Sequence, residues 1–301
     1  MKKLIETIKG IGIGVANIIP GFSGGTMAVV FGLYEKLIYA FSHFFESPLK
    51  ILKEMWGVLL GVVLGVVLAV FGITLLLDTY PVPTVLVFVG FVVGSIPKIQ
   101  TQARLTSQEM APKIAMAVGM ALLLILTFLP FTNETQGEIT LLFTIGLFFI
   151  GALGASSMVI PGVSGSLIFL VFGYYDYILT ISRDFISALF SLDLALMGDT
   201  LAYIMIFTAG IVLGVVLIAK LIEKLMCIHK SMIYGFIVGL LVASPVAILV
   251  NLQREYPSHV SEGSWMTWFI GALLAVLGFT LSYQLGKKEE TEGIEDLQED
   301  L

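Results

Sequence analysis

The sequence is poor in charged residues. They make up 13% of its 301 residues, whereas soluble domains carry roughly 25%. Apolar residues reach 57%, and residues 56–77 contain no charge at all. A helix of about 20 apolar residues is long enough to cross a bilayer. The shortage of charge therefore excludes a soluble protein and predicts an all-α polytopic membrane protein.

Cysteine and histidine are also scarce. The single cysteine, Cys227, excludes an internal disulfide and a cluster of metal-binding thiolates. His43, His229 and His259 stand far apart, so no pair has the spacing of metal ligands. We therefore expect neither a metal site nor a cofactor.

Most of the net charge of −6 belongs to the C-terminal tail, residues 287–301, which hold seven acids and two lysines. A segment of this composition is expected to be solvated and without fixed structure. The rest of the chain is close to neutral, which gives no reason to expect a nucleic-acid partner.

A short motif occurs twice in the chain. Residues 19–24 read IPGFSG, and residues 160–165, which lie 141 positions later, read IPGVSG. Further repeats in the same order are Val30–Gly32 with Val171–Gly173, Gly61 and Gly65 with Gly210 and Gly214, and Gly90–Gly94 with Gly235–Gly239. Self-similarity at a nearly fixed offset predicts two homologous halves, residues 1–135 and 136–286.

Each half contains one long apolar block and three shorter ones. The long blocks, residues 11–45 and 139–181, are interrupted by the repeated motif. We interpret each as a broken helical hairpin, and the sequence leaves open whether it is re-entrant or crosses the membrane twice. The predicted single spans are 56–77, 82–97 and 112–130 in the first half and 201–219, 231–252 and 265–285 in the second.

The distribution of lysine and arginine favours the hairpin interpretation. If both ends of each long block lie on one side, fourteen of the 16 Lys and Arg residues are cytoplasmic, together with both termini and the tail. Only Arg183 and Arg254 then lie outside. A hairpin plus three spans inverts the second half relative to the first. Inverted repeats with broken helices at the midplane are typical of secondary transporters.

The repeated motif has the chemistry of an anion site. Proline ends a helix, glycine permits a tight turn, and Ser or Thr can cap the helix that follows. A helix N-terminus offers unpaired N–H groups and about half a positive charge, which suits phosphate. The candidate phosphate-binding residues are Asn17, Pro20, Gly21, Ser23, Gly24, Gly25 and Thr26 in the first copy, and Ser157, Pro161, Gly162, Ser164, Gly165 and Ser166 in the second.

Two such N-termini supply roughly one positive charge, against −1.5 to −2 on a phosphate monoester. Lys98, Arg104 and Arg183 are candidates for supplying the rest, and Glu35 and Asp176, which occupy matched positions, are candidates for carrying a coupled proton. The alternatives remain open: the break can be only a bend in a packed hairpin, the acids can lie in the headgroup layer, and the basic residues can act only in topology.

The duplicated PG-x-SG segments, the GF-x-VG repeat and the length of about 300 residues resemble the DUF368 family of bacterial membrane proteins, over the chain up to about Leu285. The resemblance implies a multi-pass protein of the bacterial cytoplasmic membrane that moves undecaprenyl phosphate from the outer to the inner leaflet, for reuse in cell-envelope synthesis. It also implies a role for both motifs in binding the phosphate. The second copy has Ser166 and Leu167 where the first has Gly25 and Thr26, so the two loops need not act equally.

The leading functional hypothesis is therefore a translocase whose partners are a polyprenyl-phosphate lipid and the surrounding membrane lipids, with homo-oligomers an option. The alternative is a secondary transporter of a small soluble anion. A lipid phosphatase is a third hypothesis, which requires a nucleophile and an acid–base group. No histidine lies in an apolar block near either motif, so we predict that the protein is not an enzyme.

Overall fold

The computed structural model describes residues 2–17, 23–69, 74–105, 108–129, 141–163, 165, 168–169, 172–191 and 194–299. Every regular element within these ranges is a helix. In chain order the helices are α1 (Lys2–Ala16), α2 (Gly24–Val30), α3 (Tyr34–Ser42), α4 (Pro48–Leu68), α5 (Thr74–Thr79), α6 (Pro81–Gln102), α7 (Met110–Phe128), α8 (Leu141–Val159), α10 (Tyr175–Ser191), α11 (Leu194–Glu255), α12 (Pro257–Ser261) and α13 (Trp265–Glu299).

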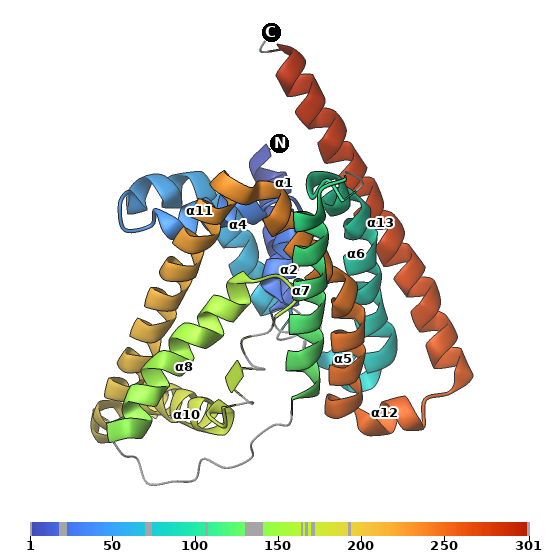
Figure 1. Cartoon of the computed structure of the whole chain (residues 1–301). Coiled ribbons are helices and arrows are strands. Elements are labelled where there is room, and N and C mark those ends of the chain that lie inside the picture. Colours follow the sequence, from blue (N-terminus) through green and yellow to red (C-terminus); the bar gives the residue numbers. More distant parts are fainter. Residues whose placement is uncertain are drawn as a thin grey trace.

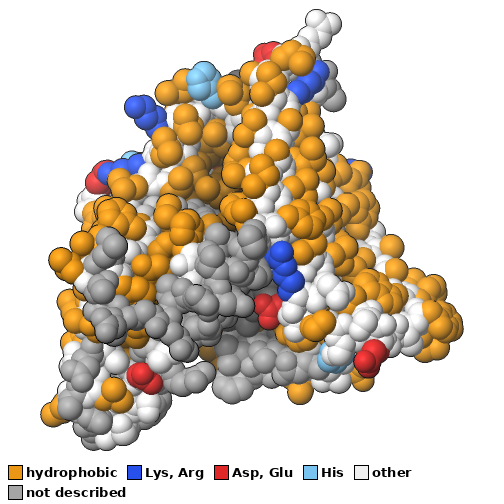
Figure 2. All heavy atoms as spheres, turned by 60° about the horizontal axis from the view of Figure 1, so that its bottom comes forward, with side chains coloured by type: hydrophobic (Ala, Val, Ile, Leu, Met, Phe, Trp, Pro, Cys, Tyr) orange, Lys and Arg blue, Asp and Glu red, His pale blue; other side chains and the backbone are white. Residues whose placement is uncertain are grey.

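Among the described residues, five helices are long and apolar enough to cross a membrane: α4, α6, α7, α11 and the first part of α13. In Figure 2, which brings the lower end of the molecule forward, apolar side chains cover most of the described surface and charged ones are sparse. The prediction of an all-helical polytopic membrane protein is confirmed.

Helix α11 consists of two helices joined at a kink. The backbone at His229 leaves helical geometry, with φ −134° and ψ 48°, and the chain reverses its direction near the upper end of Figure 1. Its stretch Leu196–Glu255 has 60 residues, about 90 Å at 1.5 Å per residue, against a hydrocarbon core of about 30 Å. Helix α11 is therefore long enough for two crossings and contains both predicted spans, 201–219 and 231–252.

The helix bounds differ from the apolar blocks in several places. The predicted span 56–77 is not one helix, because α4 ends at Leu68 and a separate helix, α5, begins at Thr74. Helix α6 continues through Pro97 to Gln102, although proline removes one backbone hydrogen bond. Helix α4 begins at Pro48, because proline suits the first turn of a helix. Helix α13 continues to Glu299, so the tail expected to lack structure is helical over most of its length. Its Glu, Lys, Gln and Leu residues are good helix formers.

Each long block contains more than one helix in the described residues. Helix α1 starts at the upper end of Figure 1 and runs to the centre, where α2 lies, and the blue segment that precedes α4 is again at the upper end. Helix α8 runs from the lower end towards the centre, and α10 lies at the lower end. The N- and C-termini are both at the upper end.

Glycines hold the same helix pairs together in the two predicted halves. Helix α1 packs on α4, and α8 packs on the first part of α11. A Cβ added to any of four glycines would overlap a carbonyl oxygen of the facing helix, so only glycine permits this approach. These contacts are Gly61 with Thr7, Gly65 with Ile11, Gly210 with Phe148, and Gly214 with Ala152. Phe148 and Ala152 lie 141 positions after Thr7 and Ile11, as the motifs do.

A second set of glycines joins the halves to each other. Helix α6 packs on α13, and the second part of α11 packs on α7. The contacts are Gly90 with the carbonyl of Ala275, Gly94 with Phe279, Gly235 with Pro112, and Gly239 with Met116. Each predicted half therefore contributes one helix to each of these two pairs. This packing of one half on the other brings the two motifs into the same central region.

Candidate functional site

The two copies of the motif touch each other. The backbone N–H of Gly162 donates a hydrogen bond to Thr26 Oγ1, with 2.7 Å between nitrogen and oxygen, although the residues are 136 positions apart. The Ser23 hydroxyl donates to the Met158 carbonyl oxygen at 3.5 Å. Ser23 is 4% exposed and Thr26 is 1% exposed. We call these four residues the motif junction.

The junction places the start of α2 against the end of α8. A Cβ on Gly25 would lie 2.8 Å from the Met158 carbonyl oxygen and 3.2 Å from that of Val159, so a side chain here would separate the helices. The N-terminus of a helix carries partial positive charge and the C-terminus partial negative charge, which makes this approach favourable. Gly162 has φ +84°, a conformation that glycine adopts without strain.

The remaining described candidates lie around the junction. Asn17 is exposed, donates from Nδ2 to the Ile13 carbonyl at 3.0 Å and lies against Gly24. The Ser157 hydroxyl donates within α8, to the Gly154 carbonyl at 2.7 Å. Gly165 packs on α8, since a Cβ there would lie 2.8 Å from the same Gly154 oxygen.

Several predicted residues have no described position. Pro20, Gly21, Ser164 and Ser166 lie outside the described residues, and the side chains of Asp176 and Arg183 are likewise not described. Their predicted roles stay predictions.

A polar cavity of about 420 Å³ adjoins the far end of α2, and we call it the lysine cavity. Helices α3, α6 and α11 bring two lysines and one carboxylate to it. Its lining residues are Val29, Gly32, Tyr34, Glu35, Lys98, Ile99, Gln102, Lys230 and Tyr234. Glu35 and Lys98 were candidates from the sequence, whereas Lys230 and Tyr234 were missed.

Glu35 is held as an anion in this cavity. Its Oε1 lies 2.8 Å from Lys230 Nζ and accepts a hydrogen bond from the Tyr234 hydroxyl at 2.5 Å. Burial raises the pKa of Glu35, but the hydrogen bonds from Lys230 and Tyr234 and the charge of the lysine together lower it more. The net pKa lies below the ordinary value, so in this conformation the carboxylate is ionised at neutral pH.

An apolar cavity of about 270 Å³ shares Tyr34 with the lysine cavity. It lies between the two parts of α11 and reaches the second motif at Ile160 and Pro161. The other lining residues are Ile218, Leu221, Ile222, Leu225, Ile233, Phe236 and Ile237. A cationic cavity and an apolar cavity therefore meet at one side chain, next to elements of both motifs.

Arg104 lines a third cavity, of about 660 Å³, which shares Gln102 and Lys230 with the lysine cavity. Three basic side chains, those of Lys98, Arg104 and Lys230, thus face two adjoining cavities at one end of the molecule.

The model of the VCA0040-like, undecaprenyl phosphate translocase-like family matches residues 13–266 of this chain. The chain belongs to this family. A polyprenyl-phosphate transporter of Staphylococcus aureus is 27% identical over 294 residues, which cover 95% of this chain and 96% of that protein. One of Vibrio cholerae is 25% identical over 258 residues, covering 81% and 77%. No solved structure matches the chain.

These relatives settle two predictions from the sequence. The family resemblance is confirmed, because the matching model covers most of the chain. The family and both relatives are named for transport and not for a reaction, so the protein is a membrane transporter and not an enzyme.

Proposed function

We propose that this protein transports polyprenyl phosphate across the bacterial cytoplasmic membrane, returning the lipid carrier for cell-envelope synthesis. The observation that carries the proposal is the contact between the lysine cavity and the apolar cavity at Tyr34. The names of the relatives support the same substrate.

The paired cavities match the two parts of a lipid phosphate. The headgroup carries −1.5 to −2 charges, and the lysine cavity has two lysines against one carboxylate. The tail is a hydrocarbon, and the apolar cavity is lined by aliphatic and aromatic side chains. A soluble anion would have no use for the apolar cavity, which is why we favour the lipid.

The motif junction is the proposed binding place of the headgroup at mid-depth, through the N–H groups and hydroxyls of the two motifs. In this conformation the Gly162 N–H is bonded to Thr26. Binding there requires an exchange in which a phosphate oxygen replaces the threonine hydroxyl as acceptor. The headgroup then passes along α2 to the lysine cavity, where Lys98 and Lys230 compensate its charge.

In this proposal Glu35 competes with the phosphate for Lys230. Before a headgroup arrives, Glu35 is paired with Lys230 and hydrogen-bonded to Tyr234. Once Lys230 turns to the phosphate, its hydrogen bond and its charge no longer lower the pKa of Glu35, while burial still raises it. Arrival of the headgroup therefore favours proton uptake by Glu35, which is the coupling role proposed for it and for Asp176.

The proposed topology has both termini in the cytoplasm and two inverted halves, 1–135 and 136–286. Two observations support it: the matched glycine contacts of α1 with α4 and of α8 with α11, and the position of both termini at one end in Figure 1. Gly32 and Gly173, at matched positions, also share a positive φ, of 65° and 72°.

The function is tested in proteoliposomes by measuring translocation of labelled polyprenyl phosphate and of inorganic phosphate. We expect lipid movement that falls at least tenfold when Lys98 and Lys230 are both changed to Gln. The matched control is Lys53→Gln, which removes an exposed lysine of α4 outside the cavity. Transport of inorganic phosphate without lipid movement would establish the soluble-anion alternative instead.

A further inference from the structure

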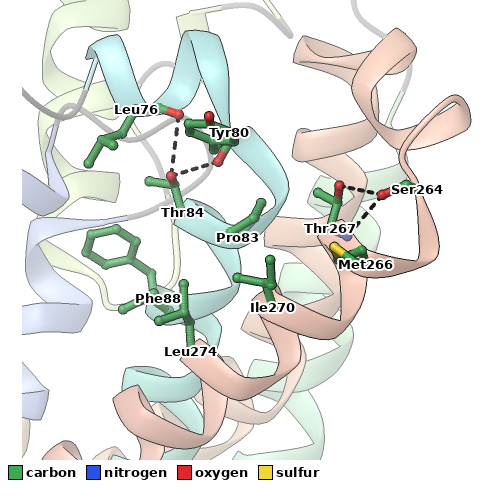
Figure 3. A pocket seen from close by; sticks show the side chains of 11 residues that line it. Leu76, Tyr80, Pro83, Thr84, Phe88, Ser264, Met266, Thr267, Ile270 and Leu274 are labelled. Carbon is green, nitrogen blue, oxygen red and sulfur yellow. Dashed lines mark hydrogen bonds between the residues drawn. The ribbon is translucent and has the colours of Figure 1, made fainter.

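A second polar cavity adjoining an apolar one lies at the lower end of the molecule, away from the termini (Figures 1 and 3). The larger, of about 680 Å³, lies between α6 and α13 beside α5, and we call it the α6–α13 groove. Its lining residues are Leu76, Tyr80, Pro83, Thr84, Val87, Phe88, Ser264, Met266, Thr267, Ile270 and Leu274. A polar bay of about 530 Å³ shares Tyr80, Ser264 and Thr267 with it.

The serine and threonine hydroxyls in the groove bond to the protein itself. Thr84 Oγ1 donates to the Tyr80 carbonyl oxygen at 2.7 Å, and the hydroxyls of Ser264 and Thr267 are 3.2 Å apart; both contacts are drawn in Figure 3. Because these groups have partners, a guest in the groove meets mainly hydrocarbon. A polar ligand would therefore bind with little favourable free energy. An apolar chain is stabilised by about 25 cal/mol for each Å² of its surface removed from water.

The groove has the depth of one membrane leaflet. It extends along α6 from Tyr80 to Phe88 and along α13 from Ser264 to Leu274, about 12 to 15 Å at 1.5 Å per residue. The hydrocarbon core of a bilayer is about 30 Å thick. The exposed Trp265 stands at the groove's polar end, as aromatic residues do at the membrane–water interface.

The inner end of the groove leads towards the centre of the protein. Phe88 is 9% exposed and packs in the same hydrophobic cluster as Met27 and Val29 of α2. Just beyond it, Gly90 brings α6 against the Ala275 carbonyl of α13, which closes the groove. A chain in the groove therefore ends at the buried core, on a helix that also contacts α2.

We infer that the α6–α13 groove binds the hydrocarbon chain of the lipid phosphate in the leaflet opposite the termini, with the headgroup in the polar bay. The inference rests on the proposed function. Ser258 and His259 offer hydrogen-bond donors in the bay, while the carboxylate of Glu262 opposes an anion. The phosphate is thus held weakly here, the chain supplies the affinity, and the headgroup gains charge compensation only on reaching Lys98 and Lys230.

The test is photo-crosslinking of the full-length protein in liposomes with polyprenyl phosphate that carries a photoreactive group in the isoprene units nearest the phosphate. We expect labelled peptides to contain Thr84–Phe88 and Ile270–Leu274. Ile270→Trp, which fills the groove, should reduce labelling at least tenfold, and Met266→Trp at its polar end should do the same. The control is Leu273→Trp on the same helix, because Leu273 is 56% exposed and does not line the groove.

Competition identifies the guest. Unlabelled polyprenyl phosphate should abolish the labelling, and the same excess of phosphatidylglycerol should not. Equal competition by both lipids, or equal labelling of Ile270→Trp and Leu273→Trp, would overturn the inference.

Translocation measured on the same liposomes distinguishes failure of this inference from failure of the proposed function. Movement of the lipid with no labelling of the groove rejects the groove alone, whereas specific labelling without movement supports the groove and rejects transport.

Discussion

At the scale of single residues, the ion pairs around the broken helices determine how the chain responds to protons. Glu6 of α1 is bonded to Lys3, with 2.8 Å between nitrogen and oxygen, and to Lys36 of α3, at 2.5 Å. Its side chain is 10% exposed. Glu35 has a comparable pair of partners in Lys230 and Tyr234, but there the pair borders a cavity and competes with a ligand.

Glu6→Gln should destabilise the protein at neutral pH by about 1 to 2 kcal/mol, because one charge-assisted hydrogen-bond network is lost and both lysines are partly solvated. Burial raises the pKa of Glu6, but its bonds to Lys3 and Lys36 and their charges lower it below 4.5. The stabilisation is therefore complete above that value and is lost as pH falls through the lowered pKa. The measurement is thermal unfolding of wild type and Glu6→Gln from neutral to acid pH. The difference between their unfolding temperatures should disappear in acid.

Glu35→Gln should bind polyprenyl phosphate about two- to fivefold more tightly at neutral pH, since an exposed ion pair is worth up to about 1 kcal/mol and Lys230 is released from it. Proton uptake on binding should disappear with the carboxylate. A binding titration in two buffers of different ionisation enthalpy measures both effects. Glu54→Gln, which changes an exposed carboxylate of α4, is the control, and equal proton uptake by wild type and Glu35→Gln would remove Glu35 from coupling.

Thr26→Val should destabilise the motif junction by about 1 to 3 kcal/mol, because the N–H of Gly162 loses its acceptor in a buried place. Thr26→Ser keeps the hydroxyl and should unfold close to the wild-type temperature. If valine and serine variants unfold at the same temperature, the hydrogen bond contributes nothing.

At the scale of helices, the pattern of glycines was readable in the sequence but the helix bounds were not. Small residues four apart are typical of close helix packing, and Gly61, Gly65, Gly210 and Gly214 do face carbonyl oxygens. The predicted span ended at Pro97, but tertiary packing on α13 keeps α6 helical beyond it. Neither proline nor glycine stands at the kink at His229. The local sequence therefore did not indicate that α11 bends there without a loop.

Gly65→Ala and its matched change Gly214→Ala should each destabilise the protein by about 1 to 3 kcal/mol, because the new methyl group overlaps a carbonyl oxygen of the facing helix. Gly198→Ala in α11 is the control. Nothing lies within 4 Å of a Cβ at that position, so alanine should stabilise the helix by up to about 1 kcal/mol. Unfolding in mild detergent compares the three, and a neutral result for Gly65→Ala and Gly214→Ala would contradict the packing.

At the scale of the whole molecule, the sequence predicted the membrane class and the family, but not the cavities. Glu35 was found because it matches Asp176 in the repeat, and Lys98 was one of the basic residues proposed to compensate the phosphate charge. Lys230 and Tyr234 were missed because their importance comes from Glu35, which lies 199 positions before Tyr234. The apolar cavity is lined by both parts of α11 and by the second motif. Because these segments are far apart in the sequence, no local sequence pattern predicts that they form one cavity.

The proposed topology can be checked with cysteine labelling in a Cys227→Ser background. Ser47→Cys, beside the start of α4, should react with a membrane-impermeant maleimide only in permeabilised cells. Ser258→Cys, on α12 at the opposite end, should react in intact cells. Labelling of both from the same side would reject the topology.

The most direct test is a cryo-EM structure of the full-length protein with polyprenyl phosphate in a lipid nanodisc. We expect phosphate density within hydrogen-bond distance of Lys98 and Lys230 or at the motif junction, with the tail in the apolar cavity beside Pro161. In the first case the Glu35–Lys230 pair should be broken. A phosphate bound away from both places and from the polar bay, with these cavities filled by ordinary phospholipid, would contradict this proposal.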